Sequence, residues 1–171
     1  PMVADILYDG ILQGTCASWK RQWLIGEALG DKGLVCGKPQ DSDPFPFNEC
    51  RRLGVTVLPE QKAEDVAKLI NQSYTVVNPC DYWGGGQRAT LEALACGVPV
   101  VCCTDSPKNR EFIEASGFGR IVEPNAQDIK KAVEDLKTNP LDPQIGVDYV
   151  KKNWTAKKYA EDLLDGINKI I

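Results

Sequence analysis

Short, uninterrupted apolar runs alternate along this chain with longer segments in which apolar residues recur every three or four positions. An uninterrupted apolar run bounded by Gly or Pro is typical of a buried strand, and the longer spacing is typical of a helix that buries one face. The first pattern predicts strands over 4–10, 32–37, 54–59, 74–79, 98–103 and 119–124. The second predicts helices over 18–29, 46–53, 62–71, 87–96, 109–116, 126–138 and 155–171.

The alternation of strands and helices indicates a single α/β domain over residues 1–171. Buried strands joined by helices form a parallel sheet that is covered on both faces. We therefore expect a doubly wound, Rossmann-like parallel sheet over about 4–138, followed by closing helices over about 142–171. Ser18 is the expected N-cap of the first helix. In open parallel sheets ligands bind outside the carboxyl ends of the strands, so the loops at that edge are the candidate site.

Of the 171 residues, 43% are hydrophobic and 26% are charged, as in an ordinary globular protein. The formal net charge of −4 argues against nucleic acid as a partner, because binding to a phosphate backbone requires a basic surface. No apolar run is long enough to span a bilayer. The seven Cys have no metal-ligand spacing and the chain has no His. We therefore expect no metal site, no His-dependent catalysis, and reduced thiols in a cytoplasmic protein.

Three consecutive glycines, Gly84, Gly85 and Gly86, stand directly before a predicted helix. Glycine leaves the backbone open to close approach, and the first turn of a helix presents free amide groups with partial positive charge. Together these features form a site for phosphate or diphosphate. Arg88 in the first turn opposes the helix dipole unless an anion offsets it, and Thr90 adds a hydroxyl. The alternative is that the glycines only form a tight turn and that Arg88 is solvated.

Glu92 lies in the second turn of the same helix, among apolar residues. It either faces solvent or points into the cleft above the sheet, where a carboxylate can accept two hydrogen bonds from a ribose diol. Glycines for phosphate and an acid for ribose indicate a nucleotide. Neither the G-x-G-x-x-G spacing nor the G-x-x-x-x-G-K-[ST] spacing is present, so dinucleotide and P-loop sites lose their main support.

The segment 79–101, with its helix-and-strand sequence LEALACGVPVV, resembles the signature region of GT-B glycosyltransferases of the retaining type. In that family the region belongs to the C-terminal, nucleotide-sugar-binding domain. The resemblance extends in order over most of the chain. It includes DILYDG, Lys20 and LIGEAL near the start, and GRIVEP, AQDIKKAVEDL and NWTAKKYAEDLLDGI toward the end.

Two positions depart from the family pattern. Glu92 matches the second Glu of the family's E-x7-E motif, which binds the ribose of the donor. The first Glu, which contacts the transferred sugar, would fall at position 84, where this chain has Gly84. The Arg that usually follows the first-strand glycine is Ile11 here, whereas Lys20 keeps the place of the partner cation that neutralises the donor diphosphate. These departures bear on donor choice and catalysis.

The resemblance implies a bound nucleotide-sugar and assigns residues to each of its parts, with no catalytic residue, metal or cofactor among them. The diphosphate would contact Lys20, Gly85, Gly86, Gln87, Arg88 and Thr90, and the ribose would contact Glu92. The base would lie near Gly37, Lys38 and Pro59. The transferred sugar would lie near Gly10, Trp83 and Gly84. Ser106 and Asn109 either reach that sugar or belong to a solvated loop.

The implied activity is glycosyl transfer from a nucleotide-sugar, with UDP or GDP as the nucleotide, to an unidentified acceptor and with retention of configuration. GT-B enzymes consist of two Rossmann-like domains. We therefore expect this domain to need an N-terminal domain or partner subunit and to show little transfer alone. Peripheral membrane contact would be a property of that partner.

Three alternatives stay open at this point. The glycine run is also similar to inverting GT-B enzymes of the lipid-linked GlcNAc transferase type. The loss of the acid at position 84 also fits a non-catalytic nucleotide-binding or interaction domain. The third alternative is a Rossmann-like regulatory domain that binds no nucleotide.

Overall fold

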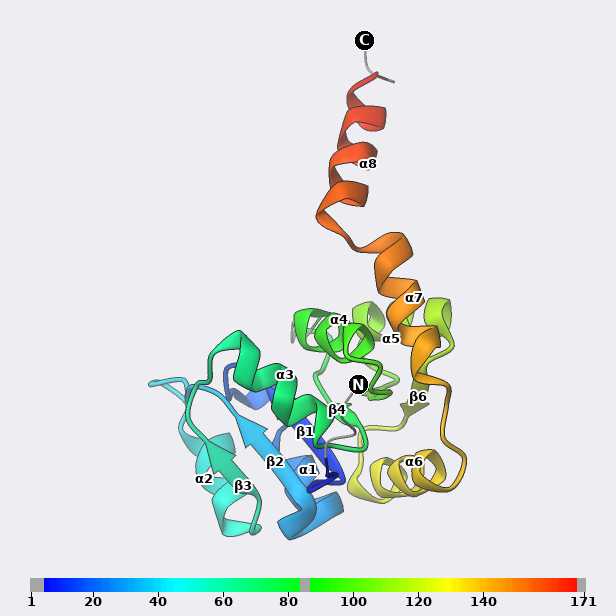
Figure 1. Ribbon diagram of the computed structural model, residues 1–171. Helices are drawn as coiled ribbons and strands as arrows, with labels where there is room; N and C mark the ends of the chain where they lie inside the picture. The colour runs from blue at the N-terminus through cyan, green and yellow to red at the C-terminus, as the bar shows by residue number, and fades with distance from the viewer. Residues whose placement is uncertain (1–4, 84–86, 169–171) are drawn as a thin grey trace.

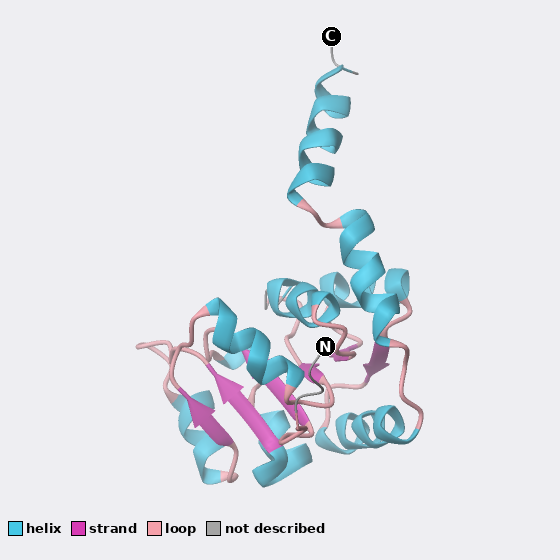
Figure 2. Ribbon diagram, in the orientation of Figure 1, coloured by secondary structure: helices cyan, strands magenta, loops and turns pink. Residues whose placement is uncertain are grey.

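The computed structural model describes residues 5–83 and 87–168, and it consists of a six-stranded sheet with helices on both faces (Figure 1, Figure 2). Each strand pairing is parallel, and the strand order is β3-β2-β1-β4-β5-β6. The strands are β1 (Gly10–Gln13), β2 (Gly33–Cys36), β3 (Thr56–Leu58), β4 (Val76–Asn78), β5 (Val100–Cys103) and β6 (Gly119–Val122).

Helices connect the strands and close the domain. The first five are α1 (Trp23–Leu29), α2 (Phe45–Arg52), α3 (Ala63–Asn71), α4 (Gln87–Ala95) and α5 (Pro107–Ser116). The last three are α6 (Ala126–Thr138), α7 (Pro143–Asn153) and α8 (Ala156–Asn168). Two short 3-10 helices, η1 (Ser18–Lys20) and η2 (Gly30–Lys32), flank α1.

Adjacent residues of each strand point into opposite halves of the core. In β1, Ile11 and Leu12 are both essentially inaccessible to solvent. Leu12 packs with side chains of α1, α2 and α6, whereas Ile11 packs with side chains of α3, α4 and α5. Burying one such side chain stabilises the fold by about 1.5–3 kcal/mol. Burial on both faces explains why these strands are uninterrupted apolar runs in the sequence.

The closing helices begin on the α4 side of the sheet. α7 packs against α4 and α5, and Gly146 lets it approach, because a Cβ there would lie 2.7 Å from the Phe118 ring. α8 extends away from the sheet beyond α7 (Figure 1). No helix within the described part of the chain combines the length and apolarity that crossing a membrane requires.

The predicted doubly wound parallel sheet is confirmed, and its first strand needs a correction. We expected that strand over 4–10, ending at Gly10, but β1 begins at Gly10 and ends at Gln13. The run 4–10 carries two acids, Asp5 and Asp9, whereas all four residues of β1 are buried. Tertiary pairing with β2 therefore selects the second run.

This correction moves Gly10, a residue of the predicted site, and Ile11, one of the two departures from the family pattern. Gly10 lies at the amino end of β1, where a Cβ would press on the side chains of Leu29 and Val77 at 2.8 Å. It does not lie at the ligand-binding edge of the sheet, where we expected the donor sugar. Ile11 is a core residue of the strand. The glycine that follows the strand is Gly14, and Thr15 comes after it.

The predicted N-cap is also wrong. Ser18 belongs to η1, and α1 begins later, at Trp23, with Gln22 in the N-cap position and no side-chain capping bond. The remaining predicted helices correspond to α2 through α6 and to α8, and the expected closing region 142–171 contains α7 and α8.

Candidate functional site

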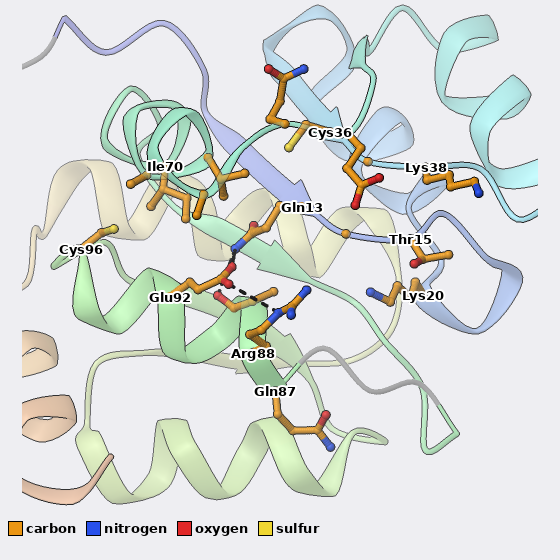
Figure 3. A pocket seen from close by; sticks show the side chains of 18 of the residues that line it. Gln13, Thr15, Lys20, Cys36, Lys38, Ile70, Gln87, Arg88, Glu92 and Cys96 are labelled. Carbon is orange, nitrogen blue, oxygen red and sulfur yellow. Dashed lines mark hydrogen bonds and ion pairs between the residues drawn. The ribbon is translucent and has the colours of Figure 1, made fainter. Parts of the chain in front are cut away.

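A cavity of about 590 Å³ opens at the carboxyl ends of β1 and β2 and runs between α3 and α4 (Figure 3). The chain proceeds from β1 through β2 to β3 on one side of the sheet and then returns to place β4 on the other side of β1. The cavity therefore lies beside the point where the strand order reverses, which is the usual ligand position in doubly wound folds. Its lining comes from four segments: 13–20, 36–38, 60–70 and 87–96.

The two ends of the cavity differ in chemistry. Figure 3 shows Lys20, Lys38 and Thr15 together at one end, with Ile70 and Cys96 at the other. Val66 and Ala67 of α3 and Ala95 of α4 extend the apolar wall. A ligand that fills this space would therefore meet two lysine side chains at one end and an apolar surface between the helices at the other.

Two glycines bring the loops after β1 and β2 into contact. Gly14 has φ +112° and donates its N–H to the carbonyl of Cys36 at 2.9 Å. A Cβ on Gly37 would overlap the carbonyl oxygen of Gly14. A Cβ on Gly14 would lie 3.0 Å from Nζ of Lys20, so the lysine ammonium lies directly over this turn. The glycines thus let Lys20 fold back over the cavity.

Glu92 points into the cavity from the middle of α4, and its side chain is 40% exposed. Nε of Arg88 lies 3.5 Å from its Oε1, and Nε2 of Gln13 donates to its Oε2 at 3.1 Å. Figure 3 draws both contacts. Arg88 itself is 90% exposed at its side chain. Its guanidinium therefore pairs with Glu92 at the mouth of the cavity.

Several of the described residues that were predicted for the site line the cavity, and the others lie elsewhere. Lys20, Gln87, Arg88 and Glu92 line the cavity, as do Gly37 and Lys38. Pro59 lines an adjoining cavity of about 530 Å³, together with Lys38, Phe47 and Arg51. Trp83 is 84% exposed and contacts Tyr82 edge-on, with 5.4 Å between the ring centroids, and it is not part of the lining. Gly84, Gly85 and Gly86 lie outside the described residues.

Thr90 is placed differently from the prediction. It is fully buried, and its hydroxyl donates to Oδ1 of Asn109 at 2.8 Å and accepts from Nδ2 of Asn78 at 2.9 Å. Ser106 accepts from Asn109 at 2.8 Å. Thr90, Ser106 and Asn109 therefore hold α4 against β4 and α5. Thr90 was expected at the diphosphate, and Ser106 and Asn109 either at the sugar or in a solvated loop, whereas all three are buried here. The helix period explains the burial of Thr90, because Thr90 and Glu92 lie about 200° apart around α4.

Gln13 is a site residue that the sequence analysis missed. It ends β1 and is 6% exposed, and its amide reaches across to α4. The available signal was the position of a polar residue at the end of the apolar run GIL, directly before Gly14. With the first strand placed too early, this residue fell in a loop.

All seven Cys are free, and six of them are buried. Burial, together with the nearby Glu92 carboxylate, raises the pKa of the Cys36 thiol to about 11. Burial raises the pKa of Cys96 in the same way, and Glu92 adds to it. The two thiols at the cavity are therefore protonated at neutral pH and poorly nucleophilic. The described residues hold no group of three or more metal-ligating side chains.

Residues 51–153 match the family model of glycosyl transferases group 1, and this match spans more than half of the chain. The chain belongs to this family. The predicted resemblance to the C-terminal domain of GT-B glycosyltransferases is thereby confirmed at the level of family and fold.

Solved glycosyltransferase structures share the fold of this group 1 chain. AviGT4, a glycosyltransferase involved in avilamycin A biosynthesis, superposes with a TM-score of 0.77 at 18% identity, over 98% of this chain and 52% of that one. HepE of Anabaena in complex with UDP and glucose gives 0.76 at 16%, over 95% and 48%. Sucrose-phosphate synthase from Thermosynechococcus elongatus gives 0.75 at 16%, over 94% and 45%. The chain thus spans about half the length of these proteins. No curated protein sequence matches it.

In this group 1 glycosyltransferase domain, Arg21 connects three loops at the ligand-binding edge. It is the one non-glycine residue with positive φ, 49°, among those the structure describes. Its Nε donates to the carbonyl of Pro79 at 2.6 Å, and its two terminal nitrogens donate to the two carboxylate oxygens of Asp105 at 2.8 Å each. The loops after β1, β4 and β5 are thereby held together. The Arg21 guanidinium lowers the pKa of the Asp105 carboxyl.

Asp105→Asn is expected to lower the free energy of unfolding by about 1 kcal/mol at pH 7, because a bidentate pair becomes a single weaker contact. The pKa of Asp105 is lower in the folded state. The stabilisation is therefore complete above the ordinary Asp pKa of about 3.9 and is lost as the pH falls through the folded value. Urea unfolding of both proteins at pH 7 and at decreasing pH measures the difference.

The matched control is Asp65→Asn, which removes an exposed pair with Lys68, whose side chain is 71% exposed. This substitution should lower the free energy of unfolding by less than about 0.5 kcal/mol. Equal effects of the two substitutions at pH 7 would show that the Arg21 contact adds nothing to an ordinary surface pair.

Proposed function

We propose that this chain is the donor-binding part of a glycosyltransferase that transfers a glycosyl group from a nucleotide-sugar to an acceptor. The observation that carries the proposal is a single cavity with a lysine ammonium at one end and the Glu92 carboxylate in its wall. Its volume of about 590 Å³ lies within the range of about 300–1,000 Å³ typical of ligand pockets. Membership of the glycosyl transferases group 1 family supports this assignment.

The donor diphosphate is proposed to bind between Lys20 and the start of α4. Lys20 supplies a full positive charge, and a helix N-terminus supplies amide groups and partial positive charge. Gln87 and Arg88 are the first described residues of α4, and both line the cavity. On the basis of the sequence, the backbone N–H groups of Gly85 and Gly86 are also proposed to donate hydrogen bonds to the diphosphate.

The ribose is proposed to bind to Glu92. Its two carboxylate oxygens can accept hydrogen bonds from the two hydroxyls of a diol. The exposed Arg88 guanidinium at Oε1 is easily displaced by one of these hydroxyls. The base is then proposed to lie by Gly37 and Lys38, which line the cavity together with Glu60. Pro59 would contact it only from the adjoining cavity.

In the proposed reaction the bond between the sugar and the diphosphate breaks, and negative charge develops on the departing nucleoside diphosphate. Lys20 and the α4 amides would stabilise that charge where it forms, and each such contact is typically worth about 10²–10³ in rate. Lys20 and Glu92 serve binding and leaving-group departure, and neither is proposed as a base. The segment 79–101 favours the retaining course, with the inverting course as the alternative. No metal is proposed to take part.

The acceptor side is proposed to come from an N-terminal domain or partner subunit. The chain spans about half the length of the glycosyltransferases that share its fold, including HepE, which was solved with UDP and glucose. A cytoplasmic location is proposed because all seven Cys are free. The alternative of a non-catalytic nucleotide-binding domain predicts donor binding without transfer by the full-length protein.

Calorimetric titration with UDP, GDP, ADP and dTDP, each with and without EDTA, tests the binding proposal. One of the four is expected to bind with a dissociation constant that EDTA leaves unchanged. At about a hundredfold excess over that constant, it should also raise the free energy of unfolding by about 2.7 kcal/mol. If none of the four binds to the folded chain, the donor-site proposal fails.

A further inference from the structure

We propose that Gln13 is a positioning residue for the donor ribose, because its amide fixes the Glu92 carboxylate in the orientation that accepts the ribose diol. This inference rests on the proposed function, since it requires that Glu92 binds ribose. It concerns a residue on another element of the fold, 79 positions away from Glu92 in the sequence.

The contact joins a rigid element to the binding group. Gln13 is the last residue of β1, which pairs with β2 on one side and β4 on the other, and the side chain is almost completely buried. Nε2 donates to Oε2 of Glu92 at 3.1 Å and to the carbonyl of Ala89 at 3.3 Å. Ala89 and Glu92 both line the cavity, and Figure 3 shows Gln13 and Glu92 pointing toward each other. One amide group therefore holds both the helix and its carboxylate.

The other partner of Glu92 cannot fix it in the same way. Arg88 lies on the same helix, its side chain is 90% exposed, and its Nε is 3.5 Å from Oε1. An exposed pair of this kind contributes little and exchanges readily with solvent. Gln13 is the buried partner, with few other conformations open to it. It holds Oε2 while Oε1 stays accessible from the cavity mouth.

The amide group is not explained by fold stability. Its carbonyl oxygen Oε1 is buried and has no hydrogen-bond partner within the described ranges 5–83 and 87–168. A buried unpaired carbonyl opposes folding, and an apolar side chain would fill this position at the end of an apolar strand without that penalty. The benefit of the glutamine therefore lies in what its N–H group holds, the Ala89 carbonyl of α4 and the Glu92 carboxylate.

A double-mutant cycle tests this role. Wild type, Gln13→Met, Glu92→Ala and the double variant are titrated calorimetrically with UDP, GDP and ADP and with the 2′-deoxy form of each. For the nucleotide that binds, Gln13→Met is expected to weaken the ribose form by about tenfold, the loss of one hydrogen bond to a charged group. It should reduce the preference for ribose over deoxyribose at least threefold, and it should add no further loss once Glu92 is Ala.

Gln22→Met is the matched control. Gln22 is also a buried glutamine whose carbonyl oxygen has no hydrogen-bond partner among the described residues, but its Nε2 donates to the backbone carbonyl of Thr15 at 3.0 Å. This variant should leave the preference for ribose over deoxyribose unchanged. Thermal unfolding checks that each variant is folded, and Gln13→Leu replaces Gln13→Met if the methionine variant does not fold.

The outcomes separate the two proposals. If wild type binds a ribonucleotide but Gln13→Met leaves the ribose preference unchanged, Gln13 does not position the carboxylate and the inference is overturned. Equal losses from Gln13→Met in the presence and absence of Glu92 would overturn it as well, because they indicate a packing effect. If wild type binds no nucleotide, the donor-site proposal itself fails, and the inference fails with it.

Discussion

Glu92→Ala is expected to weaken binding of the nucleoside diphosphate by about 100-fold. Glu92 would accept two hydrogen bonds from the ribose, each worth about 1.5–3 kcal/mol because the acceptor is charged, and losses of neighbouring bonds are not fully additive. The carboxylate is 40% exposed, so its removal leaves no buried cavity behind, and the folded chain should remain intact. Calorimetric titration of both proteins under the same ionic conditions measures the effect.

Two variants set the scale for this result. Glu92→Gln keeps the shape and one acceptor oxygen but removes the charge, and it should weaken binding by about tenfold. Glu111→Ala removes an exposed acid from α5, outside the cavity lining, and should leave the affinity unchanged. Wild-type affinity in Glu92→Ala would place the ribose elsewhere and remove the main support for the donor-site proposal.

The parts of the site that lie on α4 could be predicted from local sequence. The pattern LEALACG fixes both the helix and its end, where Gly97 has φ +69°. Glu92 was therefore placed correctly on a helix that borders the ligand edge. Its orientation was left open, because an acid among apolar residues fits either face until the packing partners are known. The structure turns it toward β1 and α3.

Thr90 shows the limit of local reasoning. It was grouped with Arg88 because both stand in the first turn, but a helix turns by about 100° per residue. The face that carries Ala93 and Leu94 packs on the sheet, and Thr90 lies on that face. Only the position of the sheet decides which hydroxyl meets solvent and which meets Asn78 and Asn109.

The error at β1 has a different cause. Both 4–10 and 10–13 contain apolar residues, and strand propensity alone favours the longer run. Pairing of Gly10–Gln13 with Gly33–Cys36 decides between them, and it connects segments more than twenty residues apart. The same long-range pairing places Gln13 beside Glu92. The hydrogen bond between these two residues therefore has no signature in the neighbouring sequence.

Gly37→Ala is expected to destabilise the domain by about 3 kcal/mol, the second large effect. An added Cβ would overlap the carbonyl oxygen of Gly14, which belongs to the backbone and cannot rotate away. The loops after β1 and β2 would have to separate, breaking the hydrogen bond from the N–H of Gly14 to Cys36. Costs of this size are typical of overpacking in a buried, close-packed site. Urea unfolding measures the loss.

Gly117→Ala separates crowding from backbone strain. Gly117 has the left-handed conformation, φ +67° and ψ 13°, and nothing lies within 4 Å of the Cβ that it would acquire. That substitution should cost only the strain of the left-handed conformation, about 1 kcal/mol. If the two variants lose the same free energy of unfolding, the loops after β1 and β2 can separate at Gly37 with little loss of stability. Their close approach would then not be what shapes the cavity.

Gly37→Ala also tests whether the glycine turn contributes to ligand binding. The loop that Gly37→Ala would displace carries Gly14 and, beyond it, Lys20, whose ammonium lies over the glycine turn. Under conditions in which the variant is fully folded, its affinity for the nucleoside diphosphate should still fall, whereas that of Gly117→Ala should not. A folded Gly37→Ala protein with wild-type affinity would show that Lys20 reaches the diphosphate without this turn, or that the diphosphate does not bind to Lys20 at all.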